Sequence, residues 1–131
     1  MNILYKKDLM KTLLSLIFIF FTFNSFALGK NTNFTNEAFL KAQSEGKIVV
    51  INSWNETCTT CAKQIIILDE AKKKFPNILF LSFEQTENES IAELLSIDYW
   101  TTIVVYKNNE EISRSIGQTN KAKIYSQIKA L

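Results

Sequence analysis

Short runs of apolar residues, separated by polar stretches, define the expected strands of this chain. The runs at 48–51, 78–83 and 102–106 are rich in β-branched and aromatic residues, a pattern typical of strands buried in a sheet. A further strand is expected at 111–116. It would join 102–106 through Asn108-Asn109, because asparagine tolerates the positive φ of a tight hairpin turn.

Apolar residues at helical spacing predict four helices around these strands. The expected boundaries of the helices are Thr35 or Asn36 to Gly46, Cys58 to Pro76, Ser90 to Ile97, and Thr119 onward. Side chains of the last two helices that are expected to face inward are Ile91, Leu94, Leu95, Ile124, Ile128 and Leu131. An acidic loop is expected from Glu84 to Glu89. The resulting order, α-β-α-β-α-β-β-α, indicates one α/β domain without repeats or linkers.

Residues 1–27 predict an export signal. Lysines precede an uncharged apolar run at 13–23, and small residues stand at the positions that a signal peptidase reads before a cut after Ala27. We therefore expect a signal peptide at 1–27 and a mature domain at 28–131, exported to the periplasm. An uncleaved membrane anchor is the alternative, although a run of 11 residues is short against the roughly 20 that a span needs. Met10 would serve as well as Met1 as the start of such a signal.

Removing that segment changes the charge of the chain. The full sequence carries 15 Lys and Arg against 13 Asp and Glu, whereas residues 28–131 carry 12 of each. The mature domain is therefore formally neutral, and its Lys72-Lys73-Lys74 run suits the solvated last turn of a helix. No basic face is expected that would bind nucleic acid or anionic lipid.

Cys58 and Cys61 form a C-x-x-C motif where the strand at 48–51 leads into a helix. Unpaired N–H groups and the helix dipole stabilise a thiolate at such a place, so we expect a lowered pKa for Cys58. A ring this short adds little stability to a fold. The chain has no histidine and no further cysteine, which excludes a four-ligand zinc site and histidine-dependent catalysis. Two interpretations of the cysteine pair remain, namely redox exchange and a two-thiolate site for a soft metal.

These features resemble the thioredoxin family over nearly all of 34–131. The resemblance rests on Trp54 four residues before Cys58, on the C-x-x-C motif at a strand-to-helix junction, on the hairpin, and on Gly117 before the last helix. It implies the thioredoxin fold, a central mixed β-sheet flanked by helices on both faces. It also implies an exposed attacking thiol at Cys58 and a more buried resolving thiol at Cys61.

The sequence departs from that family around the cysteines. Thr59-Thr60 stands between them, where thioredoxins proper have Gly-Pro. Asn52 and Ser82 occupy the positions of the family's buried acid and of its lysine partner, so Cys61 lacks the usual internal base. Glu56 is the nearest acid in sequence and would replace that base through a water molecule. The alternative is that Glu56 is an ordinary solvated loop residue.

A second departure lies in the loop that is expected to face the cysteines. Thr101 occupies the position of the family's cis-proline, and because a non-proline cis bond costs about 2.5–4 kcal/mol, both trans and cis stay open. In the family this loop docks an extended substrate and shields the thiols from metals. Because Thr101 replaces the proline, we expect both substrate docking and metal exclusion to be affected in this chain. Trp100 is expected either as a docking aromatic beside the site or as a residue packed over the motif. Trp54 is expected to be partly buried next to Cys58.

Three functions remain open at this point. The first is an exported thiol–disulfide oxidoreductase that acts on protein thiols and disulfides, leans toward reduction, and is recycled by a redox partner, in the membrane or free. The second is a metal-handling module in which Cys58 and Cys61 hold Cu(I) or share a cluster with a second chain. The third is a binding protein with an inert cysteine pair on the same scaffold. Disulfide exchange needs no cofactor, and none is expected.

Overall fold

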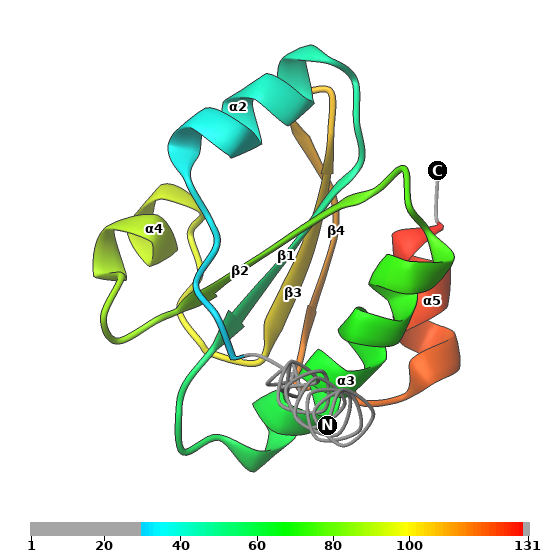
Figure 1. Cartoon of the computed structure of the whole chain (residues 1–131). Coiled ribbons are helices and arrows are strands. Elements are labelled where there is room, and N and C mark those ends of the chain that lie inside the picture. Colours follow the sequence, from blue (N-terminus) through cyan, green and yellow to red (C-terminus); the bar gives the residue numbers. More distant parts are fainter. Residues whose placement is uncertain (1–29, 130–131) are drawn as a thin grey trace, which may run out of the picture.

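The computed structural model describes residues 30–129 of the 131-residue chain. Its elements follow the predicted order, as Figure 1 shows: α2 (Asn36–Ser44), β1 (Val49–Trp54), α3 (Thr59–Lys74), β2 (Leu79–Glu84), α4 (Glu89–Leu94), β3 (Thr102–Lys107), β4 (Glu110–Ile116) and α5 (Lys121–Ile128). The expected signal peptide at 1–27, with its membrane-anchor alternative, lies outside the described residues, as does Leu131. Within 30–129, no helix combines the length and the apolar character needed to cross a membrane.

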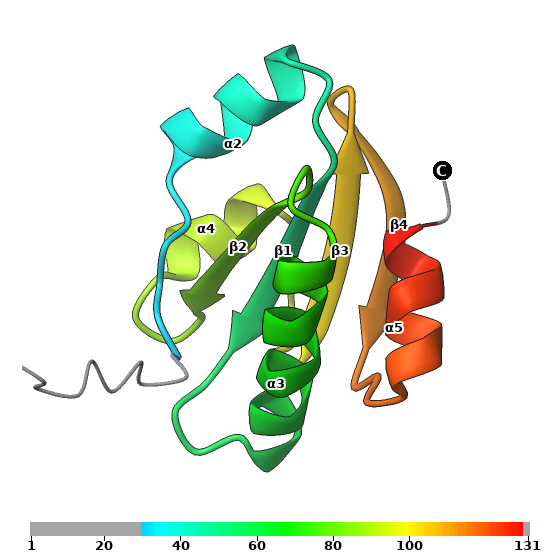
Figure 2. The same cartoon turned by 45° about the vertical axis from the view of Figure 1, so that its right-hand side comes forward.

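The strands form one mixed sheet in the order β2-β1-β3-β4. β1 runs parallel to β2 and antiparallel to β3, and β3 pairs with β4 in a hairpin. That hairpin turns through Asn108 and Asn109 with φ angles of 52° and 63°, which confirms the predicted turn. Figures 1 and 2 show α2 and α4 on one face of the sheet and α3 and α5 on the other. The expected mixed sheet with helices on both faces is confirmed.

The strand β1 is buried on both faces, which is why its sequence begins with an unbroken apolar run. Val49 and Ile51 belong to the apolar cluster that includes Ala42 of α2 and Ala92 of α4. Val50 points to the opposite face, into a cluster formed with side chains of α3 and α5. Two apolar cores therefore hold β1 from both sides and fix the position of its C-terminal end, where the cysteines follow.

Capping side chains mark the starts of α2, α3 and α5, with one difference from expectation. Thr35 caps α2, since its hydroxyl oxygen accepts a hydrogen bond from the N–H of Ala38 at 3.1 Å. The last helix is capped by Asn120 rather than by Thr119. The side-chain oxygen of Asn120 accepts a hydrogen bond from the N–H of Lys123 at 3.0 Å. Threonine and asparagine both cap helices well, so propensity does not separate these neighbours.

The segment after β2 differs from expectation at two points. Glu84 belongs to β2 and Glu89 to α4, so the acidic loop between them is shorter than predicted. Leu94 is 56% exposed instead of facing inward, because Ile91, Ala92 and Leu95 form the inner face of this segment and Leu94 is turned away from it. Leu95 is buried, as predicted, and so is Ala92.

Candidate active site

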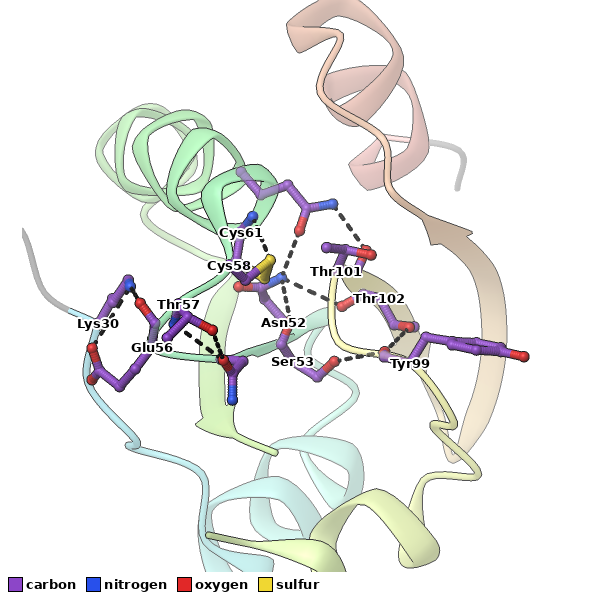
Figure 3. The surroundings of a disulfide bond; sticks show 12 residues. Lys30, Asn52, Ser53, Glu56, Thr57, Cys58, Cys61, Tyr99, Thr101 and Thr102 are labelled. Carbon is purple, nitrogen blue, oxygen red and sulfur yellow. Dashed lines mark hydrogen bonds and ion pairs between the residues drawn. A yellow bond between two sulfur atoms is a disulfide. The ribbon is translucent and has the colours of Figure 1, made fainter. Parts of the chain in front are cut away.

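The C-x-x-C motif lies at the N-terminus of α3, as predicted. Cys58 is the N-cap of the helix, and its sulfur accepts a hydrogen bond from the N–H of Cys61 at 3.1 Å. The two residues form a disulfide, with their Cα atoms 5.3 Å apart. Cys61 is fully buried, whereas Cys58 is partly exposed. A sulfur of another molecule can therefore reach this pair only at Cys58, whose surroundings are shown in Figure 3.

The loop that leads from β1 to Cys58 is held by one asparagine. The backbone oxygen of Asn55 accepts a hydrogen bond from the N–H of Cys58 at 3.2 Å. The side-chain oxygen of Asn55 accepts two more, from the N–H of Thr57 at 3.1 Å and from the Thr57 hydroxyl at 2.9 Å. An asparagine that bonds the backbone two residues on forms a turn by its own side chain. The backbone before the exposed sulfur is therefore fixed by local hydrogen bonds.

A buried carboxylate supports that loop from the neighbouring strand. Glu84, the last residue of β2, is 3% exposed. Its oxygens accept hydrogen bonds from the Asn55 amide at 2.9 Å, from the Glu87 N–H at 2.7 Å, and from the Thr86 hydroxyl at 2.7 Å. Burial acts to raise the pKa of Glu84, but these hydrogen bonds outweigh burial and leave the pKa below its ordinary value. Glu84 is therefore ionised at neutral pH.

Two neutral amide side chains, Asn52 and Gln64, are buried near the C-x-x-C motif. Gln64 follows the second cysteine by one helical turn and is fully buried. Its amide nitrogen donates to the backbone oxygens of Thr101 at 2.9 Å and Gln118 at 3.0 Å, and its oxygen accepts from the Asn52 amide at 3.4 Å. Asn52 is also buried, and its side-chain oxygen has no partner among the described residues. This buried amide pair is therefore polar but uncharged.

The loop from Tyr99 to Thr102 lies beside the disulfide in Figure 3. The peptide bond before Thr101 is trans, and no cis bond occurs within 30–129, which answers the question left open by the sequence. Thr101 has a φ of 69°, a left-handed conformation that costs a non-glycine residue about 1–2 kcal/mol. Its N–H donates to the backbone oxygen of Ser53, and its own oxygen accepts from Gln64 and Gly117. These bonds hold the strained backbone in place.

The two tryptophans have different surroundings. Trp54 is buried more completely than expected and packs in one cluster with Cys61 and Ile65. Trp100 is 45% exposed and, with Tyr99 and its neighbours, lines an open hollow of about 320 Å³. The expectation that Trp100 packs over the cysteines as a buried residue is therefore wrong. Its position agrees with the other alternative, an aromatic side chain available to a docking partner.

The remaining predicted site residues lie at the solvent side of the motif. The Glu56 carboxylate is exposed and forms an ion pair with Lys30 at 3.7 Å, which agrees with a solvated loop residue rather than with a base for Cys61. Thr59 and Thr60 are the first residues of α3, and neither is buried. Their contribution is to begin the helix directly after the exposed sulfur.

Comparison with known proteins identifies the family to which this geometry belongs. The sequence model of the family described as Thioredoxin matches residues 30–130. The chain belongs to the thioredoxin family. It is 29% identical to an H-type thioredoxin of Fagopyrum esculentum, over 63% of this chain and 71% of the relative. It is 23% identical to the thioredoxin of Chlamydia trachomatis, over 72% of this chain and 91% of that protein. The crystal structure of the Fasciola hepatica thioredoxin matches with a TM-score of 0.64 at 23% identity, over 72% of this chain and 91% of that one.

Membership in the thioredoxin family, together with the Cys58–Cys61 disulfide, identifies a thiol–disulfide oxidoreductase that acts on protein thiols and disulfides. The family comparison argues against an inert binding protein on this scaffold. Among residues 30–129, no group of three or more His, Cys, Asp or Glu side chains could hold a metal ion. For a soft metal, the described part of the thioredoxin domain therefore offers the two cysteine sulfurs alone.

Three residues near the site were not predicted as functional, namely Asn55, Gln64 and Glu84. The helical spacing could have pointed to Gln64. It lies at an inward position of α3 together with Ile65 and Leu68, and an uncharged polar residue at such a position needs buried hydrogen-bond partners. For Glu84, the signal is a charged residue at the end of a mostly apolar strand. The contact between Glu84 and Asn55 joins positions 29 residues apart and has no local signal.

Proposed function

We propose that this thioredoxin-family protein is exported and reduces disulfides in protein substrates, with Cys58 as the attacking sulfur and Cys61 as the resolving one. The observation that carries the proposal is the different placement of the two sulfurs. The sulfur of Cys58 is partly exposed at a helix N-terminus and receives the Cys61 N–H at 3.1 Å, while Cys61 is buried behind it. Such a helix end favours the thiolate, which is the reactive form.

The proposed reaction has two exchange steps. In the first, the Cys58 thiolate attacks one sulfur of a substrate disulfide, forming a mixed disulfide and releasing the other substrate sulfur as a thiolate. In the second, Cys61 loses its proton and attacks the Cys58 sulfur. The Cys58–Cys61 disulfide forms, and the second substrate sulfur leaves. The substrate gains two electrons and the protein loses two, so a dithiol partner must reduce the protein again before the next cycle.

The surroundings of Cys61 make the second step different from that of thioredoxins proper. Asn52 stands where the family has a buried acid, and an amide does not accept a proton as a carboxylate does. The proton of Cys61 therefore has to leave by another route, to solvent or to the departing substrate thiolate. We expect resolution of the mixed disulfide to be slower than the attack by Cys58.

The reductive direction and the export of the protein are supported by sequence features. The chain resembles small single-domain exported relatives that keep other cysteines reduced, and it has no helical domain inserted between the elements at 30–129. The lysine-flanked apolar stretch before Ala27 supports export to the periplasm, by cleavage or as an anchor. The recycling partner would then be a dithiol protein on the same side of the membrane or within it.

The test is a turnover assay with the full chain. Reduced protein is expected to accelerate the reduction of a protein disulfide such as that of insulin, with dithiothreitol as the electron source. Cys58→Ser should abolish the acceleration, and Cys61→Ser should accumulate a mixed disulfide with the substrate, because the resolving sulfur is missing. Lys63→Ser, at an exposed position of α3, is the matched control and should retain full activity.

Other outcomes decide against the proposal. Equal rates for the wild type and Cys58→Ser would remove Cys58 from the reaction. Stoichiometric copper on the purified protein, lost in Cys58→Ser, would favour the metal-handling alternative. Export is tested separately, because the periplasmic fraction should contain a chain whose mass corresponds to a cut after Ala27. A chain found only in the cytosol with its N-terminus intact would refute export and leave the exchange activity untouched.

A further inference from the structure

Glu84 is an unusual group for its place in the fold. It is a carboxylate buried at the end of β2, and none of the ion pairs among residues 30–129 involves it. Burying a charge is unfavourable unless hydrogen bonds replace the lost water. Here three donors do so: the Asn55 amide at 2.9 Å, the Thr86 hydroxyl at 2.7 Å and the Glu87 N–H at 2.7 Å. The arrangement keeps a negative charge in the interior without a cation.

The contacts continue from Glu84 to the exposed cysteine. The amide nitrogen of Asn55 is occupied by Glu84, which orients the amide oxygen toward Thr57. The backbone oxygen of the same asparagine accepts the N–H of Cys58 at 3.2 Å. One side chain therefore joins the carboxylate to the turn that ends at Cys58. Only Asn55 makes both contacts among the hydrogen bonds of the described residues.

We propose that Glu84 is a positioning residue for Cys58: its carboxylate orients Asn55, and through Asn55 it fixes the turn that holds the Cys58 sulfur against the Cys61 N–H at the start of α3. This inference rests on the proposed function in that Cys58 is taken as the reacting sulfur. Glu84 does not touch the sulfur and is not a catalytic residue. Its effect is on the thiolate, because the sulfur is stabilised only while it stays aligned with the helix end.

The chemistry of a carboxylate explains why other residues fit this place poorly. A glutamate offers two acceptor oxygens to the three donors. Glutamine offers one oxygen and brings two N–H groups of its own, which would face the donors of Thr86 and Glu87. Aspartate keeps the charge, but its side chain is one methylene shorter and cannot hold the same set of contacts. Glu84→Asp therefore separates position from charge.

The decisive measurement is the rate of Cys58 alkylation by iodoacetamide in the reduced full chain, followed against pH by mass spectrometry. Glu84→Asp should move the midpoint of the profile upward by about half a pH unit, so that alkylation at pH values well below the midpoint is about threefold slower. Glu87→Asp makes the same change at an exposed acid three residues further on, and its profile should overlay the wild type. The readout needs no substrate protein, so it stays informative even if the exchange activity fails.

A second variant tests the route through Asn55. Asn55→Ala, at a partly buried position, should produce the same upward shift, and the double variant Glu84→Asp/Asn55→Ala should shift no further than Asn55→Ala alone. If Glu84 had a purely structural role, Glu84→Asp would lower the free energy of unfolding, but the alkylation profiles of Glu84→Asp and Asn55→Ala would both coincide with that of the wild type. Additive shifts in the double variant would show that Glu84 acts independently of Asn55. Either result overturns the inference. If Glu84→Gln shifted the alkylation midpoint downward and Glu84→Asp left it unchanged, Glu84 would act through its charge and not by positioning Cys58, which would also overturn the inference.

Discussion

Two buried polar clusters flank the C-x-x-C motif, and they are built on different principles. One helical turn beyond Cys61, Gln64 and its partner Asn52 form a neutral layer whose hydrogen bonds are made by amides. Beside the loop to Cys58, Glu84 forms a charged layer whose hydrogen bonds converge on one carboxylate. The thioredoxin family usually has its buried acid under the second cysteine. Here the buried acid lies under the approach to the first.

The difference indicates which step of the chemistry each cluster serves. A neutral layer holds the backbone of the neighbouring loop but takes up no proton, so it supports the position of Cys61 without acting as its base. A charged layer is rigid while ionised and weakens when it is protonated. Loss of a hydrogen bond in the neutral cluster should therefore lower the free energy of unfolding equally at any pH. The stability contributed by the charged cluster should itself change with pH.

Removing Gln64 should give the largest effect on stability. Gln64→Ala deletes a fully buried side chain, leaves a cavity, and takes the donor away from the Gln118 backbone oxygen. We expect the free energy of unfolding to fall by about 4 kcal/mol at all pH values, measured by urea denaturation. Lys63→Ala, on the exposed side of the same helix, is the control and should change it by less than about 0.5 kcal/mol. A small or strongly pH-dependent loss in Gln64→Ala would contradict a neutral structural layer.

Placing a charge in the neutral cluster should give the next largest effect. Asn52→Asp restores the family's acid, but Ser82 faces it across β1 and β2 where the family has lysine. Burial should raise the pKa of this aspartate, so the variant should lose about 3 kcal/mol at neutral pH. Because the folded form then binds the proton more tightly than the unfolded chain, this loss should disappear as the pH falls toward about 4.

Adding a cation sharpens that test. Asn52→Asp/Ser82→Lys should recover part of the lost stability at neutral pH, because the lysine charge favours the ionised carboxylate. It should also speed the resolving step if the carboxylate then serves as a base for Cys61, seen as less accumulated mixed disulfide in the turnover assay. Equal stability of Asn52→Asp and wild type across the pH range would show that this site is open to water, contrary to the structure.

Removing the charge of Glu84 should give an intermediate, pH-dependent loss in the free energy of unfolding. The pKa of Glu84 lies below its ordinary value of 4.5 in the folded chain, so its contribution to stability is complete above about 4.5 and is lost as the pH falls through the lowered pKa. Glu84→Gln should be less stable by about 2 kcal/mol at neutral pH, and this difference should shrink below pH 4. Denaturation curves at several pH values measure it, with Glu87→Gln as control. A constant difference at every pH would contradict an ionised Glu84.

Relieving the loop opposite the disulfide should give the smallest effect, and with the opposite sign. Thr101 has a φ of 69°, which glycine adopts without penalty. Thr101→Gly should therefore raise the free energy of unfolding by about 0.5–1 kcal/mol, although the more flexible unfolded chain offsets part of the gain. Thr60→Gly, in the first turn of α3, should lower it by a similar amount. A loss of stability in Thr101→Gly would show that the threonine side chain contributes contacts that exceed the strain.

Much of this fold could be predicted from sequence because its signals are local. The unbroken run at 48–51 predicts a doubly covered strand, Pro76 stops α3, and Asn108-Asn109 predicts the hairpin turn. The placement of the cysteines at a strand-to-helix junction follows from the same pattern. The sequence did not separate neighbours of equal capping propensity, such as Thr119 and Asn120. It also did not separate adjacent apolar residues of which only one lies on the inner face, such as Leu94 and Leu95.

The support of the site could not be predicted in the same way. In the sequence, Glu84 is one acid among several in an acidic stretch. Its contact with Asn55 depends on the register of β2 beside β1. The sequence left Trp100 with two alternatives, because the exposure of an aromatic residue in a loop depends on what packs around it. The trans peptide at Thr101 likewise depends on backbone partners that lie far away in the chain.

The central claim is that the Cys58–Cys61 disulfide is an exchanging one rather than a structural one. Its most direct test is the reduction potential of the pair, obtained by equilibrating the full chain with glutathione redox buffers and trapping the free thiols. We expect a single two-electron transition between about −270 and −120 mV, the range of known exchangers. A disulfide that stays oxidised below about −300 mV, where structural disulfides lie, would contradict it.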